Sequence, residues 1–186
     1  MSDATTDLAW FRQPAAGSPG TINACFNAVD RHVVRGLADE VALVSDREYS
    51  YARLLTEVAA FAGALRAFDL TVGHEVLVAG LPPLEHVIAT LACARLGLVV
   101  HDTEPPAPAM AVLGTRPGAP VGEAPVITAD GSGELTWDTA MAAGRTDPGA
   151  CLDVPGDAPL RVVDGRAVPV AAHLAAVAAG QVQDAV

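Results

Sequence analysis

The 186-residue sequence contains no lysine, and all eleven of its cationic side chains are arginines. The chain therefore lacks the residue that forms Schiff bases and that often binds phosphate as a point charge. A formal net charge of −11 argues further against DNA, RNA or an anionic membrane surface as a partner. No apolar run approaches the roughly 20 residues that a membrane-spanning helix needs.

Cysteine and aromatic residues are also scarce. Cys25, Cys93 and Cys151 are three in number and far apart, so they cannot all pair within one chain, and no spacing suits zinc. We therefore predict no metal site, and reduced thiols with structural roles for Cys25 and Cys93. The N-terminus lacks a basic region followed by an apolar run, so we expect no secretion signal and a cytoplasmic location. Aromatic residues make up 4%, which predicts a core of small, closely packed side chains.

Apolar periodicity through residue 102 predicts an α/β fold with a mostly parallel sheet flanked by helices. The first predicted helix is capped by Thr21 and turns Asn27 and Asp30 toward solvent. Two short strands around a turn are expected at 41–46 and 47–51.

A second helix, capped by Ser50, is expected to run to about Phe68. Buried parallel strands are predicted at 76–81 and 98–102. The helix between those strands has Pro83 in its first turn and ends at Gly97.

The remaining chain is rich in proline and glycine. We predict a short helical turn at AMAVL (109–113), a strand at 125–131 and a strand at 158–163, followed by a tight turn and a helix. The predicted organisation is a flexible arm over residues 1–20 and one α/β domain over 21–186. Within that domain, 103–186 diverges from the better patterned part, 21–102.

Two segments carry a family resemblance. NACFNAVDRHV (23–33) and the stretch from YSYARLL to LGLVVH (49–101), with LACARLG at 91–97, resemble the N-terminal part of acetyl- and propionyl-CoA synthetases. Those adenylate-forming enzymes join a carboxylate to AMP with ATP and magnesium, then pass the acyl group to coenzyme A. The resemblance implies that residues 21–102 fold as the first subdomain of such an enzyme, with Asp30, Arg31 and His32 serving packing.

The family's phosphate loop is a Thr-Ser-Gly-Thr-Thr-Gly-x-Pro-Lys-Gly run after a strand. Residues 157–180 lie at the matching place, but the loop is shortened to Asp164-Gly165-Arg166-Ala167. One glycine and one arginine cannot supply the converging N–H groups, hydroxyls and lysine of such a loop. The resemblance also implies that most of the adenine site, the magnesium carboxylate and the catalytic lysine lie beyond residue 186. We therefore expect this chain not to use ATP, magnesium or coenzyme A as cofactors.

Five residues are candidates for a site. His101 and Asp102 end a predicted parallel strand, where open α/β sheets place ligands, and with His173 they are the candidate acid–base residues. Adjacent strand residues point to opposite faces, so His101 and Asp102 are not expected to pair with each other. Gly165 and Arg166 could hold an anion at the start of the last helix.

Three hypotheses follow. The first is a non-catalytic or regulatory module, derived from an acyl-CoA synthetase, that acts through self-association or a protein partner. That partner could be a full-length acyl-CoA synthetase or a neighbouring pathway enzyme, and Trp10-Phe11 could either dock into it or fold back. The second is a repurposed enzyme acting on an acyl, acyl-CoA or carboxylate metabolite. The third is one part of a split acyl-CoA synthetase.

Overall fold

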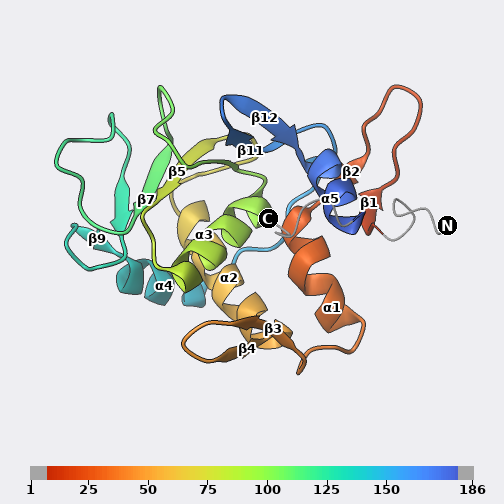
Figure 1. The fold of residues 1–186 in the computed structure, drawn as a ribbon, viewed down its shortest axis with the longest axis horizontal. Helices are drawn as coiled ribbons and strands as arrows, with labels where there is room; N and C mark the ends of the chain where they lie inside the picture. The colour runs from red at the N-terminus through yellow and green to blue at the C-terminus, as the bar shows by residue number, and fades with distance from the viewer. Residues whose placement is uncertain (1–7, 180–186) are drawn as a thin grey trace.

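A seven-stranded sheet forms the centre of the computed structural model, which describes residues 8–179 (Figure 1). The strand order is β12-β11-β6-β5-β7-β8-β9. The strands are β5 (Glu75–Ala79), β6 (Val99–His101), β7 (Met110–Leu113), β8 (Val126–Thr128), β9 (Leu135–Thr136), β11 (Pro159–Val163) and β12 (Arg166–Pro169). All neighbouring strands are parallel except β11 and β12. The predicted α/β fold with a mostly parallel sheet is confirmed.

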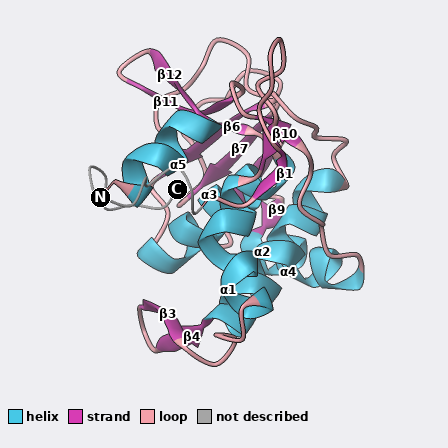
Figure 2. Cartoon of the chain, turned by 90° about the vertical axis from the view of Figure 1, so that its right-hand side faces the viewer, coloured by secondary structure: helices cyan, strands magenta, loops and turns pink. Residues whose placement is uncertain are grey.

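Two smaller sheets flank this core. The predicted strand pair is present as the antiparallel β3 (Val41–Val44) and β4 (Glu48–Ser50). This hairpin lies at one end of the molecule in both views, away from the main sheet (Figures 1 and 2). The other small sheet joins β1 (Trp10–Arg12), β2 (Thr21–Ile22) and β10 (Val154–Pro155).

The aromatic pair near the N-terminus folds back onto the chain. Trp10 and Phe11 lie in β1, within the segment expected to form a flexible arm. Trp10 packs against the main hydrophobic core, and the Phe11 ring meets the Phe26 ring edge-on at 5.1 Å. Of the two alternatives for this pair, the structure shows packing on the chain's own core.

Four longer helices accompany the sheet: α2 (Tyr51–Arg66), α3 (Pro83–Leu96), α4 (Trp137–Thr146) and α5 (Val170–Ala178). The Ser50 hydroxyl caps α2 by accepting from the Arg53 N–H at 3.3 Å, and Gly97 ends α3 with φ of 68°. Both signals were readable in the sequence. No helix among the described residues is long and apolar enough to cross a membrane.

The first helix differs from its prediction. Thr21 lies in β2, and Asn23 is the capping residue, because its side-chain oxygen accepts from the Phe26 N–H at 3.0 Å. A π-helical turn, η2 (Phe26–Asp30), then leads into α1 (Arg31–Val34). Asn27 is buried and Asp30 is largely so, which contradicts their expected solvent-facing positions. A single π turn shifts the helical register, which a regular 3.6-residue pattern does not anticipate.

Two predictions for the second half of the chain were wrong. The segment AMAVL contains strand β7, which pairs with both β5 and β8, so its four residues are wholly buried. The residues after Gly165 form β12, antiparallel to β11, and the last helix begins at Val170. A tight hairpin therefore stands where we expected a turn directly into a helix.

The two faces of the sheet are covered differently. Val76 and Val78 of β5 face the main core with α2 and α3. Leu77, between them, points to the other face and packs with Ala111 and with Val121 from the proline-rich segment after β7. That second face is thus covered, over β5 and β7, by irregular chain.

Candidate functional site

A cavity of about 320 Å³ lies at the carboxyl ends of β6 and β11. Its lining includes three of the five predicted site residues: His101, Asp102 and Gly165. The other charged residues of the lining are Glu104 and Asp164, and Thr103 is its remaining polar residue. Parallel strands that end at one edge of the sheet bring these residues together, as the ligand-site rule for open α/β sheets anticipates.

His101 and Asp102 point to different surroundings. His101 is buried, and its Nε2 lies 3.6 Å from Glu75 Oε1, beyond hydrogen-bond distance. Asp102 is exposed and lines the acidic cavity together with a second, larger one. The two side chains form no hydrogen bond with each other in the described structure, as the alternation of strand side chains predicts.

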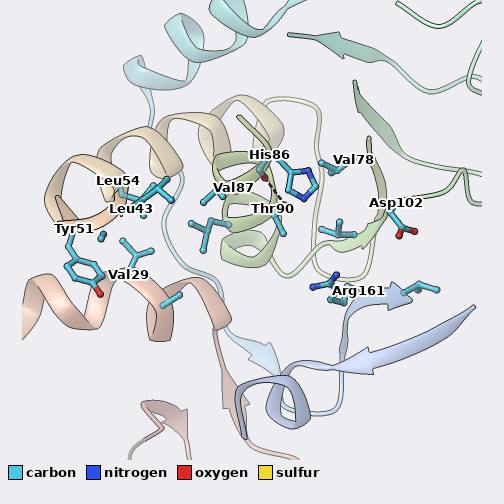
Figure 3. Close-up of a pocket in the computed structure, with 15 residues that line it drawn as sticks. Val29, Leu43, Tyr51, Leu54, Val78, His86, Val87, Thr90, Asp102 and Arg161 are labelled. Atoms are coloured by element: carbon cyan, nitrogen blue, oxygen red, sulfur yellow. Dashed lines mark hydrogen bonds between the residues drawn. The ribbon is translucent and has the colours of Figure 1, made fainter. Parts of the chain in front are cut away.

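The larger cavity has a volume of about 500 Å³ and lies between the sheet, the first half of α3, η2 and the β3 hairpin. Figure 3 shows its apolar end, where Leu43, Tyr51 and Leu54 gather. Asp102 and Arg161 lie toward the opposite end (Figure 3). An apolar cavity of this size with a few polar groups at one end has the general character of a small-molecule site.

Arg161 is the residue of this cavity that sequence reasoning missed. It lies in β11, opposite Val100 of β6, and its side chain is partly buried. No hydrogen bond or ion pair to the Arg161 side chain is found among residues 8–179. The sequence signal was the one charged residue inside the apolar strand 158–163.

The other two predicted residues stand apart from both cavities. His173 is buried on α5, which packs beside β11 and β12, and it lines neither cavity. Arg166 is exposed at the first position of β12. Because α5 begins only at Val170, Arg166 is not at a helix start, and the predicted role of the helix dipole there is wrong. The proposed acid–base set of His101, Asp102 and His173 is not assembled in one place.

Residues 30–113 match the family described as "AMP-binding enzyme". This part of the chain is similar to that family. The matched segment extends from Asp30, at the end of η2, to Leu113, the last residue of β7.

Curated relatives agree with this match. The chain is 44% identical over 87 residues to acetyl-coenzyme A synthetase of Deinococcus radiodurans, covering 43% of this chain and 13% of the relative. It is 42% identical over 105 residues to acetyl-coenzyme A synthetase of Mycobacterium bovis, covering 51% of this chain and 16% of the relative. An uncharacterized protein of Pseudomonas aeruginosa is 35% identical to this chain over 111 residues, which cover 50% of this chain and 18% of that protein. The chain thus spans less than one fifth of the length of these relatives.

Solved structures show the same fold. VinN aligns with a TM-score of 0.66 at 14% identity, over 92% of this chain and 47% of VinN. The anthranilate CoA ligase AuaEII, in complex with anthranoyl-AMP, aligns with a TM-score of 0.60 at 16% identity, over 80% of this chain and 32% of the ligase. At such identities the likeness concerns the fold.

A buried polar cluster joins the matched segment to residues on either side of it. Arg95 of α3 donates from Nη1 to both oxygens of Asp30, at 2.9 and 2.8 Å, and its Nε donates to the Gly149 carbonyl at 2.6 Å. Cys25 and Cys151 lie beside this ion pair. Burial acts to lower the pKa of Arg95, but its interactions with Cys25, Cys151 and Asp30 outweigh burial and hold that pKa above its ordinary value.

Proposed function

We propose that this chain is a binding module of the AMP-binding family that does not itself carry out ATP-dependent acyl adenylation. The observation that carries the proposal is the β11–β12 hairpin, at the place where the resemblance puts the phosphate loop. Val163 pairs with Arg166 across a two-residue turn, and Val162 pairs with Ala167. The backbone there is engaged in antiparallel pairing, so successive N–H groups do not converge on one anion as they do in a phosphate nest.

Electrostatics at the same edge support the proposal. The cavity beside the hairpin carries the carboxylates of Asp102, Glu104 and Asp164, and the only cationic group in its lining would be a protonated His101. Like charges disfavour a bound polyphosphate at this position. The proposal therefore includes that ATP, magnesium and coenzyme A are not cofactors of this segment.

Carboxylate-dependent exchange of labelled pyrophosphate into ATP tests the absence of adenylation. We expect no exchange above the protein-free blank with acetate or propionate, and no ATP-dependent rise in the unfolding midpoint. A complete acetyl-CoA synthetase assayed in parallel serves as the positive control. Exchange that depends on both the carboxylate and this chain would overturn the proposal.

We propose further that the module acts through self-association or a protein partner. Large apolar side chains are exposed at the end of the molecule formed by α1 and β3, where Val34 is 77%, Val44 67% and Val41 49% exposed. The β3–β4 sheet has only two strands, and a two-stranded sheet is marginally stable by itself. Exposed apolar groups beside an open strand edge favour association.

Size-exclusion chromatography with light scattering tests the self-association arm. We expect a dimer or larger species, and we expect Val44→Glu to shift it toward monomer because a charge is placed in an apolar contact. Val163→Glu introduces the same charge at the distant hairpin end and serves as the matched control. If the chain is a monomer at all concentrations, only the protein-partner alternative is left. A pull-down of a defined, purified acyl-CoA synthetase that depends on Val44 then tests that alternative. If the chain neither self-associates nor binds the synthetase through Val44, the proposal is contradicted.

A small acyl carboxylate is a second candidate, favoured by Arg161 in the 500 Å³ cavity. Arg161 is partly buried and its side chain has no hydrogen bond or ion pair to residues 8–179, while the far end of the cavity is apolar. An arginine suits a carboxylate because its planar fork can donate two hydrogen bonds. The apolar end would take the hydrocarbon part of the same ligand.

Octanoate is a suitable probe for this candidate. Binding to the folded state raises the unfolding midpoint by mass action. We expect octanoate to raise the midpoint of the wild-type chain and of Arg166→Gln, whose side chain is exposed elsewhere, but not that of Arg161→Gln. Equal responses from the two variants would contradict an ion pair between Arg161 and the ligand.

A further inference from the structure

Two thiols flank one buried carboxylate near the carboxyl end of α3. Cys25, in the helical turn before η2, donates to Asp30 Oδ2 at 3.7 Å. Cys151, in the irregular segment after α4, donates to Asp30 Oδ1 at 3.7 Å. The two sulfurs and an Asp30 oxygen all lie within 4.8 Å of one another. Folding thus brings together two cysteines that are remote in sequence.

Arg95 decides what chemistry this cluster can do. Its Nη1 donates to both Asp30 oxygens and lies 3.5 Å from Cys25 Sγ. The guanidinium therefore already supplies the positive charge that a bound metal ion would bring. The Asp30–Arg95 pair is electrically balanced whether the thiols are reduced or joined, because a dithiol and a disulfide are both uncharged.

We propose that Cys25 and Cys151 are a reversible redox modification site, at which a small-molecule disulfide such as oxidised glutathione joins them. Cys151 is partly exposed, so its thiolate attacks the reagent, and one sulfur leaves as a thiol. Cys25, which is fully buried, then attacks the mixed disulfide and releases the second thiol. The cysteine protons pass to the two departing thiolates, so two protein thiols and one disulfide reagent give one protein disulfide and two small thiols.

The surrounding contacts hold the two cysteines in position. The Leu152 N–H donates to the Arg95 carbonyl at 2.9 Å. The Asn23 side-chain amide donates to the same carbonyl at 2.9 Å and to the Leu152 carbonyl at 3.0 Å. The neighbours of both cysteines are therefore docked on one helix end. The two sulfurs must come closer before they can bond. Cys151 makes this movement, because it lies outside regular structure.

The bond would join the helical turn before η2 to the segment after α4 and close a loop that includes most of the domain. A cross-link over a long loop restricts the unfolded chain and stabilises the folded one. Oxidation would thus act as a covalent lock on the AMP-binding segment, independent of whether the chain adenylates. Cys93 cannot take part in the same way, because it lies fully buried within α3 and has no neighbouring thiol in this cluster.

The full chain, equilibrated in buffers of increasing oxidised to reduced glutathione, tests the proposal. Non-reducing peptide mapping by mass spectrometry should find the Cys25–Cys151 peptide in the wild type and in Cys93→Ser. The unfolding midpoint of those two proteins should rise by roughly 5–15 °C on oxidation. Cys25→Ser and Cys151→Ser should show neither change.

Three results would overturn the proposal that Cys25 and Cys151 form a reversible disulfide. In the first, the folded wild type keeps both thiols free at the most oxidising ratio. In the second, the cross-link runs through Cys93 instead. In the third, Cys151→Ser gains the same midpoint rise as the wild type.

Discussion

The guanidinium of Arg95 and the carboxylate of Asp30 form a buried ion pair, with Nη1 2.9 and 2.8 Å from the two carboxylate oxygens. Asp30 belongs to NACFNAVDRH and Arg95 to LACARLG, the two segments whose resemblance to acyl-CoA synthetases was most specific. These side chains are only 14% and 8% exposed. The packing role expected for Asp30 is thus realised as a link between η2 and α3.

Asp30→Asn should destabilise the fold strongly. The substitution keeps the shape of the side chain but leaves the Arg95 charge buried without its counter-ion, which typically costs about 3–5 kcal/mol. Urea unfolding followed by circular dichroism gives the change in the free energy of unfolding.

Asp153→Asn is the matched control. Asp153 pairs with Arg12 at 3.4 Å, but those side chains are 51% and 76% exposed, and exposed pairs contribute about 0–1 kcal/mol. Equal effects of the two substitutions would show that the Asp30–Arg95 pair is not a buried electrostatic link.

Gly144→Ala should also destabilise the protein, through the contact of α2 with α4. A Cβ at Gly144 would collide with the Ala60 carbonyl oxygen and approach the Ala64 nitrogen to 2.9 Å, and both are backbone atoms that cannot move aside cheaply. Overpacking of this kind costs about 1–3 kcal/mol. Ala142→Ser, at an exposed position of α4, should stay within about 0.5 kcal/mol in the same urea titration. If Gly144→Ala left the free energy of unfolding unchanged, the two helices would not be in close backbone contact.

Local signals explain why the first half of the fold could be predicted from sequence. Ser50 and Gly97 mark a helix start and a helix end by their own chemistry, and both act as expected. Strand β6 is short, begins with two valines and is buried along its length, as strands covered on both faces are. None of these features depends on distant parts of the chain.

The missed features depend on tertiary contacts. The apolar segment AMAVL is too short for its periodicity to distinguish a strand from a helix. It forms a strand because it pairs with β5 and β8. The site residue Arg161 matters only because folding opens a cavity beside it. Similarly, the burial of Asp30 requires Arg95 as a partner, and no local pattern indicates that pair.

The β11–β12 turn yields a third prediction. Asp164 and Gly165 have φ of 50° and 72°, the left-handed conformation that both central residues of a type I′ hairpin turn adopt. Gly165→Ala should therefore cost about 1 kcal/mol, because alanine is strained there. Gly118→Ala is the control, since Gly118 has an ordinary φ and open space around it. Stability measured by urea unfolding should fall for the first variant only; an unchanged Gly165→Ala would argue against the hairpin turn.

The reactivity of Cys151 should depend steeply on pH. The adjacent Cys25 side chain and burial raise the pKa of the Cys151 thiol above the ordinary cysteine value, with the negative charge of Asp30 acting in the same direction and Arg95 opposing it. The thiolate is the species that attacks a disulfide, so its fraction controls the first step. At every pH below that raised pKa, the thiolate fraction grows about tenfold per pH unit.

We therefore expect the initial rate of Cys25–Cys151 cross-linking by oxidised glutathione to rise about tenfold for each pH unit between about 7 and 9. Quenching with acid and alkylation, followed by mass spectrometry, measures the rate at each pH. Cys93 is an internal control: burial raises its pKa to about 12 and hides it from the reagent, so it should stay reduced throughout. A rate that is flat from pH 7 to 9 would mean that opening of the segment around Cys151, and not ionisation of its thiol, limits the reaction.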